Sequence, residues 1–104
     1  MTAETAPSPE LTIVVPVYNE AAALPALLAE LLPFAAALPA EVILVDDGSS
    51  DGSRTILEAA ARPGVTILRH KLNRGYGGAL KSGLAAARTR YTITIDADGQ
   101  HRLE

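Results

Sequence analysis

Four short runs of aliphatic and β-branched residues alternate with segments of helical periodicity along this chain. The runs occupy residues 11–15, 42–45, 65–68 and 91–95. Between the first two runs, leucines recur at helical spacing, at Leu24, Leu27, Leu28 and Leu31. A single helix between successive strands requires a crossover connection, which is nearly always right-handed and produces parallel strands. The alternation therefore predicts an α/β fold: a three-layer α/β/α domain with a mainly parallel, Rossmann-like sheet.

Prolines and small polar residues mark the expected boundaries of these elements. Pro16 is expected to end the first strand, and Pro33 and Pro39 are expected to bracket the end of the first helix, because proline lacks a backbone N–H. Ser50 or Asp51 is expected to be the N-cap of the second helix, since either side chain accepts hydrogen bonds from first-turn N–H groups.

A glycine-rich segment, GYGGALKS at residues 75–82, approaches two phosphate-binding patterns without matching either. Leu80 stands where both the P-loop and the dinucleotide fingerprint require glycine, and it would push the backbone away from a phosphate. We therefore reject both patterns and predict a helix whose apolar side carries Tyr76, Leu80, Gly83, Leu84 and Ala87. The glycines of the segment are expected to let this helix pack tightly on the sheet.

The composition of the 104-residue chain narrows the classes of function. A net charge of -3 argues against nucleic-acid binding, which relies on an excess of Lys and Arg. The absence of cysteine excludes disulfides and thiolate metal sites, and a cytoplasmic setting is the default expectation. Residues 1–10 lack the features of a signal peptide and are expected to form a flexible leader. No apolar run reaches the length of about 20 residues that spans a membrane.

Two carboxylates, Asp96 and Asp98, directly follow the fourth run, after a strand that we expect to be buried. Carboxylate oxygens are preferred ligands of Mg²⁺ and Mn²⁺, and such ions bridge the oxygens of a diphosphate. Gln100 offers an amide oxygen as a further ligand, whereas His101 is a weaker candidate. The alternative is a solvated turn whose acids only cap the next segment, and the pair alone leaves both open.

Polar residues also follow the first two runs, at strand ends that a parallel sheet brings to one edge. After the second run, Asp47 is the candidate for a hydrogen bond to a ribose hydroxyl or a base N–H, while Asp51 suits a turn or a cap. After the first run, Tyr18 and Glu20 either contact a nucleobase or belong to an ordinary turn. Asn19 is expected to cap the first helix.

Four segments resemble family 2 glycosyltransferases of the GT-A fold, and in particular the polyprenyl- or dolichyl-phosphate sugar transferases. They are PVYNE (16–20), VDDGSSDGS (45–53), NRGYGGALKSGL (73–84) and DADGQH (96–101). The resemblance implies that residues 11–104 are the nucleotide-sugar-binding, N-terminal part of such a domain. It implies nucleotide binding by Pro16, Tyr18, Glu20, Asp47 and Asp96. It also implies a Mg²⁺ or Mn²⁺ site made by Asp96, Asp98 and Gln100.

The resemblance further implies an inverting transfer of a hexose from a UDP- or GDP-sugar to a polyprenyl or dolichyl phosphate. In that family the acceptor-binding half and the later catalytic residues lie beyond the point that matches residue 104. We therefore expect this chain alone to bind nucleotide weakly and to transfer little sugar. The full-length enzyme is expected in the cytoplasm or at the cytoplasmic face of a membrane.

Two functions from other classes are alternatives. One is a non-catalytic nucleotide-binding or scaffolding domain, which would differ in lacking metal-dependent nucleotide affinity. The other is a receiver-like phosphoacceptor, which would need a lysine at a later strand end that the sequence does not show. The sugar, the base and the acceptor are left open by these residues.

Overall fold

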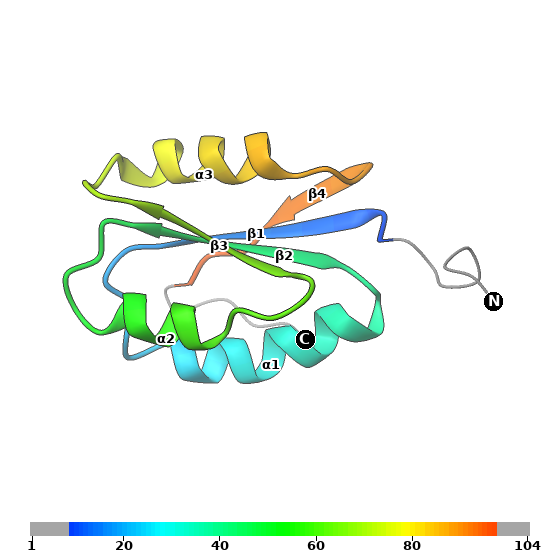
Figure 1. The fold of residues 1–104 in the computed structure, drawn as a ribbon, viewed down its shortest axis with the longest axis horizontal. Coiled ribbons are helices and arrows are strands. Elements are labelled where there is room, and N and C mark those ends of the chain that lie inside the picture. Colours follow the sequence, from blue (N-terminus) through cyan, green and yellow to red (C-terminus); the bar gives the residue numbers. More distant parts are fainter. Residues whose placement is uncertain (1–8, 98–104) are drawn as a thin grey trace.

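The computed structural model describes residues 9–97 of the chain. In chain order its elements are β1 (Leu11–Val17), α1 (Leu24–Ala37), β2 (Glu41–Asp47), α2 (Ser53–Ala59), β3 (Val65–His70), α3 (Gly75–Ala86) and β4 (Tyr91–Thr94). Each strand and each helix expected from the sequence is present in this order (Figure 1).

The four strands form one parallel sheet in the order β3-β2-β1-β4. The chain moves outward from β1 to β3 and then returns to the other side of β1, so its direction reverses between β1 and β4. Helices α1 and α2 cover one face of the sheet and α3 covers the other (Figure 1). The predicted three-layer α/β/α fold is confirmed, and the reversal creates the crevice in which open parallel sheets bind ligands.

Each face of the sheet has its own apolar core. Ile13 and Val15 of β1 pack with the helices α1 and α2, whereas Val14 and Val45 pack with α3 on the opposite face. Successive residues of a strand point to opposite faces, so a central strand buried on both faces must be apolar throughout. The burial predicted for the first two strands is therefore confirmed.

Helix α3 approaches the sheet most closely at Gly83. An added β-carbon there would collide with a methyl group of Val14 and lie 3.3 Å from one of Val45. At Gly75 and Gly77, by contrast, an added β-carbon would meet no other atom within 4 Å. The prediction that the glycines of residues 75–82 allow tight packing is therefore wrong at these two positions, because the close approach occurs further along the helix.

The apolar side predicted for α3 is only partly correct. Ala79 and Gly83 form the buried row, and both are small. Tyr76 and Leu84 are exposed instead, with 57% and 49% of their surface accessible. The reason is distance: a helix that lies this close to the sheet has no room for large side chains on its buried row.

Pro16 does not end β1, as the sequence had suggested, because the strand continues to Val17. The Val14 carbonyl accepts a hydrogen bond from the Ile95 N–H, so the backbone of Val14 faces β4. Pro16, two residues on, faces the same side, but the pairing of β1 with β4 ends at Val14. The missing N–H of Pro16 therefore costs no sheet hydrogen bond.

Pro33 lies inside α1, so the prediction that it brackets the end of this helix is wrong. Proline removes the hydrogen bond to the carbonyl four residues earlier, which belongs to Ala29. Both Pro33 and Ala29 are exposed, and water can therefore replace the lost donor. The buried row of α1, which includes Leu28, Leu31 and Ala35, holds the helix against the sheet on either side of the proline.

The second helix begins at Ser53 with Gly52 as its N-cap, so the prediction of Ser50 or Asp51 at that position is wrong. Asp51 nevertheless stabilises the start of the helix, because its Oδ1 accepts a hydrogen bond from the Ser53 N–H at 2.8 Å. The carboxylate reaches the first turn from one residue further back than a standard cap.

Asn19 joins the loop after β1 to the loop after β2. Its φ of 53° is in the left-handed region, which asparagine tolerates better than most residues. Its Oδ1 accepts hydrogen bonds from the N–H groups of Ser50 at 2.8 Å and Asp51 at 3.3 Å, and its own N–H donates to Ser49 Oγ. The expectation that Asn19 caps the first helix is wrong, since α1 begins at Leu24.

Strand β4 is mostly exposed, which corrects the expectation that a buried strand precedes Asp96. Tyr91 and Ile93 are 56% and 44% accessible. β4 lies at the edge of the sheet and pairs only with β1, while α3 lies over β1 and β2. Within residues 9–97, no helix of the fold therefore covers β4 as α3 covers its neighbours.

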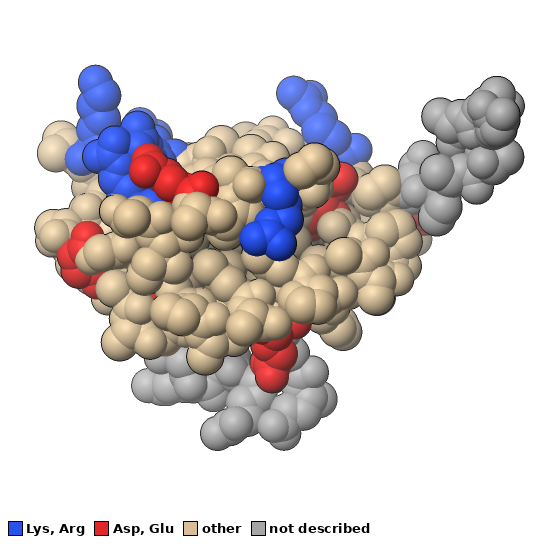
Figure 2. All heavy atoms as spheres, turned by 60° about the horizontal axis from the view of Figure 1, so that its bottom comes forward, with Lys and Arg blue, Asp and Glu red and all other residues tan. Residues whose placement is uncertain are grey.

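The outward side of α1 carries few charges. Glu30 is the one charged residue of this helix, and Phe34 is 45% accessible. The face of the molecule to which α1 and α2 contribute is accordingly mostly neither acidic nor basic (Figure 2). Among residues 9–97, no helix is both long and apolar enough to cross a membrane.

Candidate functional site

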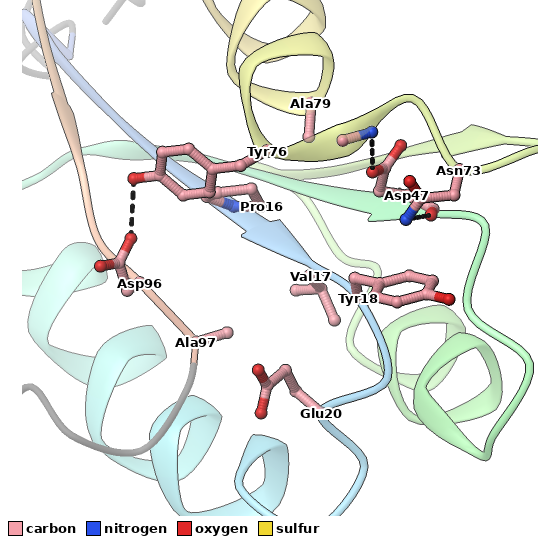
Figure 3. Close-up of a pocket in the computed structure, with 11 residues that line it drawn as sticks. Pro16, Val17, Tyr18, Glu20, Asp47, Asn73, Tyr76, Ala79, Asp96 and Ala97 are labelled. Carbon is pink, nitrogen blue, oxygen red and sulfur yellow. Dashed lines mark hydrogen bonds between the residues drawn. The ribbon is translucent and has the colours of Figure 1, made fainter.

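A pocket lies at the carboxyl ends of the strands, beside the point where the sheet order reverses. Its volume is ≈ 530 Å³, within the range of about 300–1,000 Å³ that small-molecule sites occupy. The five residues predicted to bind nucleotide all line it (Figure 3): Pro16, Tyr18, Glu20, Asp47 and Asp96. The fold thus brings together strand ends that are up to 80 positions apart in the sequence, from 16 to 96.

Asp47 connects the end of β2 to the start of α3. Its Oδ1 accepts the Arg74 N–H and its Oδ2 accepts the Gly75 N–H, both at 2.9 Å. Gly75 has a φ of 86°, a left-handed conformation that side-chain-bearing residues rarely adopt, and it turns this N–H toward the carboxylate. The Asn73 side chain also donates to the Asp47 carbonyl at 3.3 Å. The negative charge therefore lies at the positive end of the helix dipole of α3.

His70, the last residue of β3, makes a buried contact with the same carboxylate. Its Nδ1 lies 2.7 Å from Asp47 Oδ1, and its Nε2 lies 2.8 Å from Ser82 Oγ on α3. The carboxylate is an acceptor, so Nδ1 carries the hydrogen of the first bond. A chain of three side chains therefore runs from α3 through β3 to the pocket wall.

Tyr76 and Asp96 meet across the opposite side of the pocket. The Tyr76 hydroxyl, at the start of α3, donates to Asp96 Oδ1 at 2.8 Å (Figure 3). This bond joins α3 to the segment that follows β4. It also fixes the direction of a carboxylate that the sequence predicts to contact both nucleotide and metal.

The loop after β2 is organised by its own acids. Hydrogen bonds from the Ser53 hydroxyl and the Ser53 N–H, with a further one from the Ala21 N–H, hold the pKa of Asp51 below its ordinary value of 3.8. Asp46 is buried and accepts the Ser49 N–H at 3.0 Å. These acids stabilise the turn, and neither is among the residues that line the pocket.

The metal site predicted from the sequence is described only in part. Asp96 lines the pocket, whereas Asp98 and Gln100 lie outside the described residues. Within residues 9–97, no group of three or more His, Cys, Asp or Glu side chains could hold a metal ion. The carboxylate of Asp96 is an oxygen donor of the type that hard divalent cations prefer, so this one described member of the predicted set is compatible with Mg²⁺ or Mn²⁺.

The family model described as "Glycosyl transferase family 2" matches residues 12–104. The chain belongs to this family. A relative in Serratia proteamaculans, undecaprenyl-phosphate 4-deoxy-4-formamido-L-arabinose transferase, is 44% identical over 100 residues, covering 91% of this chain and 31% of the relative. The dolichyl-phosphate beta-glucosyltransferase of Dictyostelium discoideum is 34% identical over 100 residues, covering 86% of this chain and 31% of the relative. This chain thus spans about a third of the length of these family 2 relatives.

Solved structures, one of them of a mannosyltransferase, share the fold. The mannosyltransferase PcManGT of Pyrobaculum calidifontis, in complex with GDP-Man and Mn²⁺, matches with a TM-score of 0.66 and 27% identity over 89% of this chain and 28% of its own. S. aureus TarS 1-349 in complex with UDP matches with a TM-score of 0.69 and 26% identity, over 86% of this chain and 27% of its own. The predicted likeness to the GT-A fold is therefore confirmed for this family 2 chain.

Three polar side chains that shape this family 2 pocket were not predicted from the sequence. Asn73 and Tyr76 line it, and His70 supports it from behind. Tyr76 was assigned to the apolar side of its helix because its spacing fits that side. His70 ends a strand at the same carboxyl edge as Asp47, and that shared edge is the signal that would have drawn attention to it.

Proposed function

We propose that this family 2 member is the donor-binding part of an inverting glycosyltransferase that moves a hexose from a UDP- or GDP-sugar to a polyprenyl or dolichyl phosphate. One observation carries the proposal: four sequence motifs, far apart along the chain, all contribute residues to one pocket at the carboxyl edge of the sheet. Residues 11–104 would form the nucleotide-sugar-binding part. The names of the relatives support a lipid-phosphate acceptor, which would bring the whole enzyme to a membrane, and we propose the cytoplasmic face.

Asp47 is the proposed contact for the nucleoside. A carboxylate offers about four acceptor positions, and among the described residues three are taken, by His70, Arg74 and Gly75. The remaining position is on Oδ2 and suits a single donor, such as an imide N–H of a base or a ribose hydroxyl. Tyr18 is 49% accessible at the same pocket and offers an aromatic face for stacking on the base.

Asp96 is the proposed link between nucleotide and metal. Its carboxylate lines the pocket, and Asp98 and Gln100 would supply further oxygen ligands from the segment that follows. The Mn²⁺ in the complex of PcManGT supports a divalent ion in this family. When bound, such an ion stabilises the negative charge of the departing diphosphate. The hydrogen bond from the Tyr76 hydroxyl leaves the second carboxylate oxygen of Asp96 outside that bond.

The test is calorimetric titration of UDP and of GDP into the 104-residue chain, with and without Mn²⁺. We expect one nucleotide to bind in a metal-dependent way. Asp96→Asn and Asp98→Ala should each weaken that binding by about tenfold or more, since each removes a charged ligand. Glu30→Gln is the matched control, because it also removes one carboxylate but lies on the outward side of α1, away from the pocket.

The outcomes separate the proposal from its rival. Nucleotide affinity that is the same with and without Mn²⁺, and the same in the two aspartate variants as in the wild type, would favour a non-catalytic nucleotide-binding or scaffolding domain. Binding of neither nucleotide would contradict the proposed donor site. That the chain alone transfers little sugar stays a prediction, and robust turnover in a coupled assay with a prenyl-phosphate acceptor would contradict it.

A further inference from the structure

We propose that His70 is a positioning residue of the nucleotide site, which holds the Asp47 carboxylate in the orientation it presents to the pocket, and that Ser82 supports the His70 ring from behind. The identity of the ligand rests on the proposed function, whereas the side-chain geometry does not. The chain of contacts is short: 2.8 Å from Ser82 Oγ to His70 Nε2, and 2.7 Å from His70 Nδ1 to Asp47 Oδ1.

Burial makes the series of contacts from Ser82 through His70 to Asp47 rigid. The side chains of His70 and Asp47 are only 6% and 3% accessible. A buried polar group without a partner is costly, and a partly satisfied buried network is worse than none. Among the described residues, however, no buried side-chain nitrogen or oxygen lacks a hydrogen bond. Each ring nitrogen of His70 thus makes one hydrogen bond within the protein, and neither is available for another ligand.

The directions of the bonds show what His70 adds. The two backbone donors to Asp47 come from consecutive residues, Arg74 and Gly75, at the start of α3. His70 approaches from a different element, the end of β3. The two amides bind one oxygen each and tie the carboxylate to α3 alone, whereas the bond from His70 ties it to β3 as well. His70 therefore holds the plane of the carboxylate against tilting with α3.

The connectivity of Ser82, His70 and Asp47 is that of a serine hydrolase triad, but the placement is reversed. In a hydrolase the serine meets the substrate and the aspartate is remote. Here Asp47 lines the pocket, while Ser82 lies within α3 and is not among the lining residues. Ser82 therefore orients His70, and His70 orients Asp47.

Two variants of His70 separate the bonds. In His70→Asn the side-chain amide nitrogen takes the place of Nδ1, so the variant keeps a hydrogen-bond donor for Asp47 and loses the hydrogen bond with Ser82. In His70→Gln the side-chain amide nitrogen takes the place of Nε2, so the variant keeps a hydrogen-bond partner for Ser82 and loses the hydrogen bond with Asp47. We expect nucleotide affinity within about threefold of wild type for His70→Asn, and a loss of about tenfold or more for His70→Gln. A purely structural role would change both variants alike, in proportion to their thermal stability.

A measurement without ligand keeps the two proposals apart. Hydrogen exchange of the Arg74 and Gly75 amides reports whether Asp47 still accepts their bonds. We expect His70→Gln to speed this exchange by about tenfold and His70→Asn to leave it nearly unchanged. Unchanged exchange in a folded His70→Gln would refute the positioning role. Faster exchange in His70→Gln, combined with no nucleotide binding by the wild type, would support that role and refute the donor site. Equal nucleotide affinities for the two variants would also refute the role of His70.

Discussion

Replacing Gly83 by alanine is expected to destabilise the fold, even though alanine is the better helix former. The new methyl group would collide with a methyl of Val14 and lie 3.3 Å from one of Val45, both on central strands. Overpacking a rigid core costs about 1–3 kcal/mol, while exchanging glycine for alanine in a helix returns about 0.5–1 kcal/mol. We expect a net loss of about 1–2 kcal/mol, or roughly 5–15 °C in Tm for a domain of this size.

Gly77→Ala is the matched control for this experiment. Gly77 belongs to the same helix, but an added β-carbon there would meet no other atom within 4 Å. It should therefore gain up to about 0.5–1 kcal/mol from helix propensity without any collision. Urea unfolding followed by circular dichroism gives both values, and their difference isolates the overpacking term. A Gly83→Ala variant as stable as Gly77→Ala would show that α3 does not lie against Val14 as described.

Two further predictions concern the loops that shape the site. Asn19→Ala loses two accepted hydrogen bonds and strains a left-handed backbone, so we expect a loss of about 1–2 kcal/mol; Asn19→Gly should lose less, because glycine accepts that backbone. Urea midpoints compare the two variants, and equal losses would contradict the strain. Asp51 has a folded-state pKa below 3.8, so its stabilisation is complete above that pH and is lost as the pH falls through the lowered pKa. Asp51→Asn should therefore flatten the decline of Tm below pH 4, and an unchanged acid profile would contradict this assignment.

The order of elements was predictable because apolar residues recur at different spacings in strands and in helices, and each segment of this sequence follows one spacing throughout. The central strands β1 and β2 are apolar at nearly every position, which only burial on both faces explains. The boundaries were less predictable. Pro16 and Pro33 looked like stops, but each lies where its missing N–H costs little: one beyond the pairing with β4, the other on the exposed side of α1. Whether a proline ends an element depends on what would have received its N–H, and tertiary structure decides that.

The pocket was predictable at the strand ends and unpredictable in its supporting contacts. Pro16, Asp47 and Asp96 converge because parallel strands must place their carboxyl ends at one edge, so topology alone brings them together. His70 and Asp47 are paired in register at the ends of β3 and β2, so strand pairing brings their side chains together. The bond of Tyr76 with Asp96 has no such signal, because it depends on how closely α3 lies to the sheet. That distance is set by Gly83, far along the helix from this contact. One small residue in the core thus determines whether α3 is close enough for the Tyr76 hydroxyl to reach Asp96 and for the backbone N–H groups at its start to reach Asp47. This is why overpacking at Gly83 should weaken nucleotide binding as well as stability.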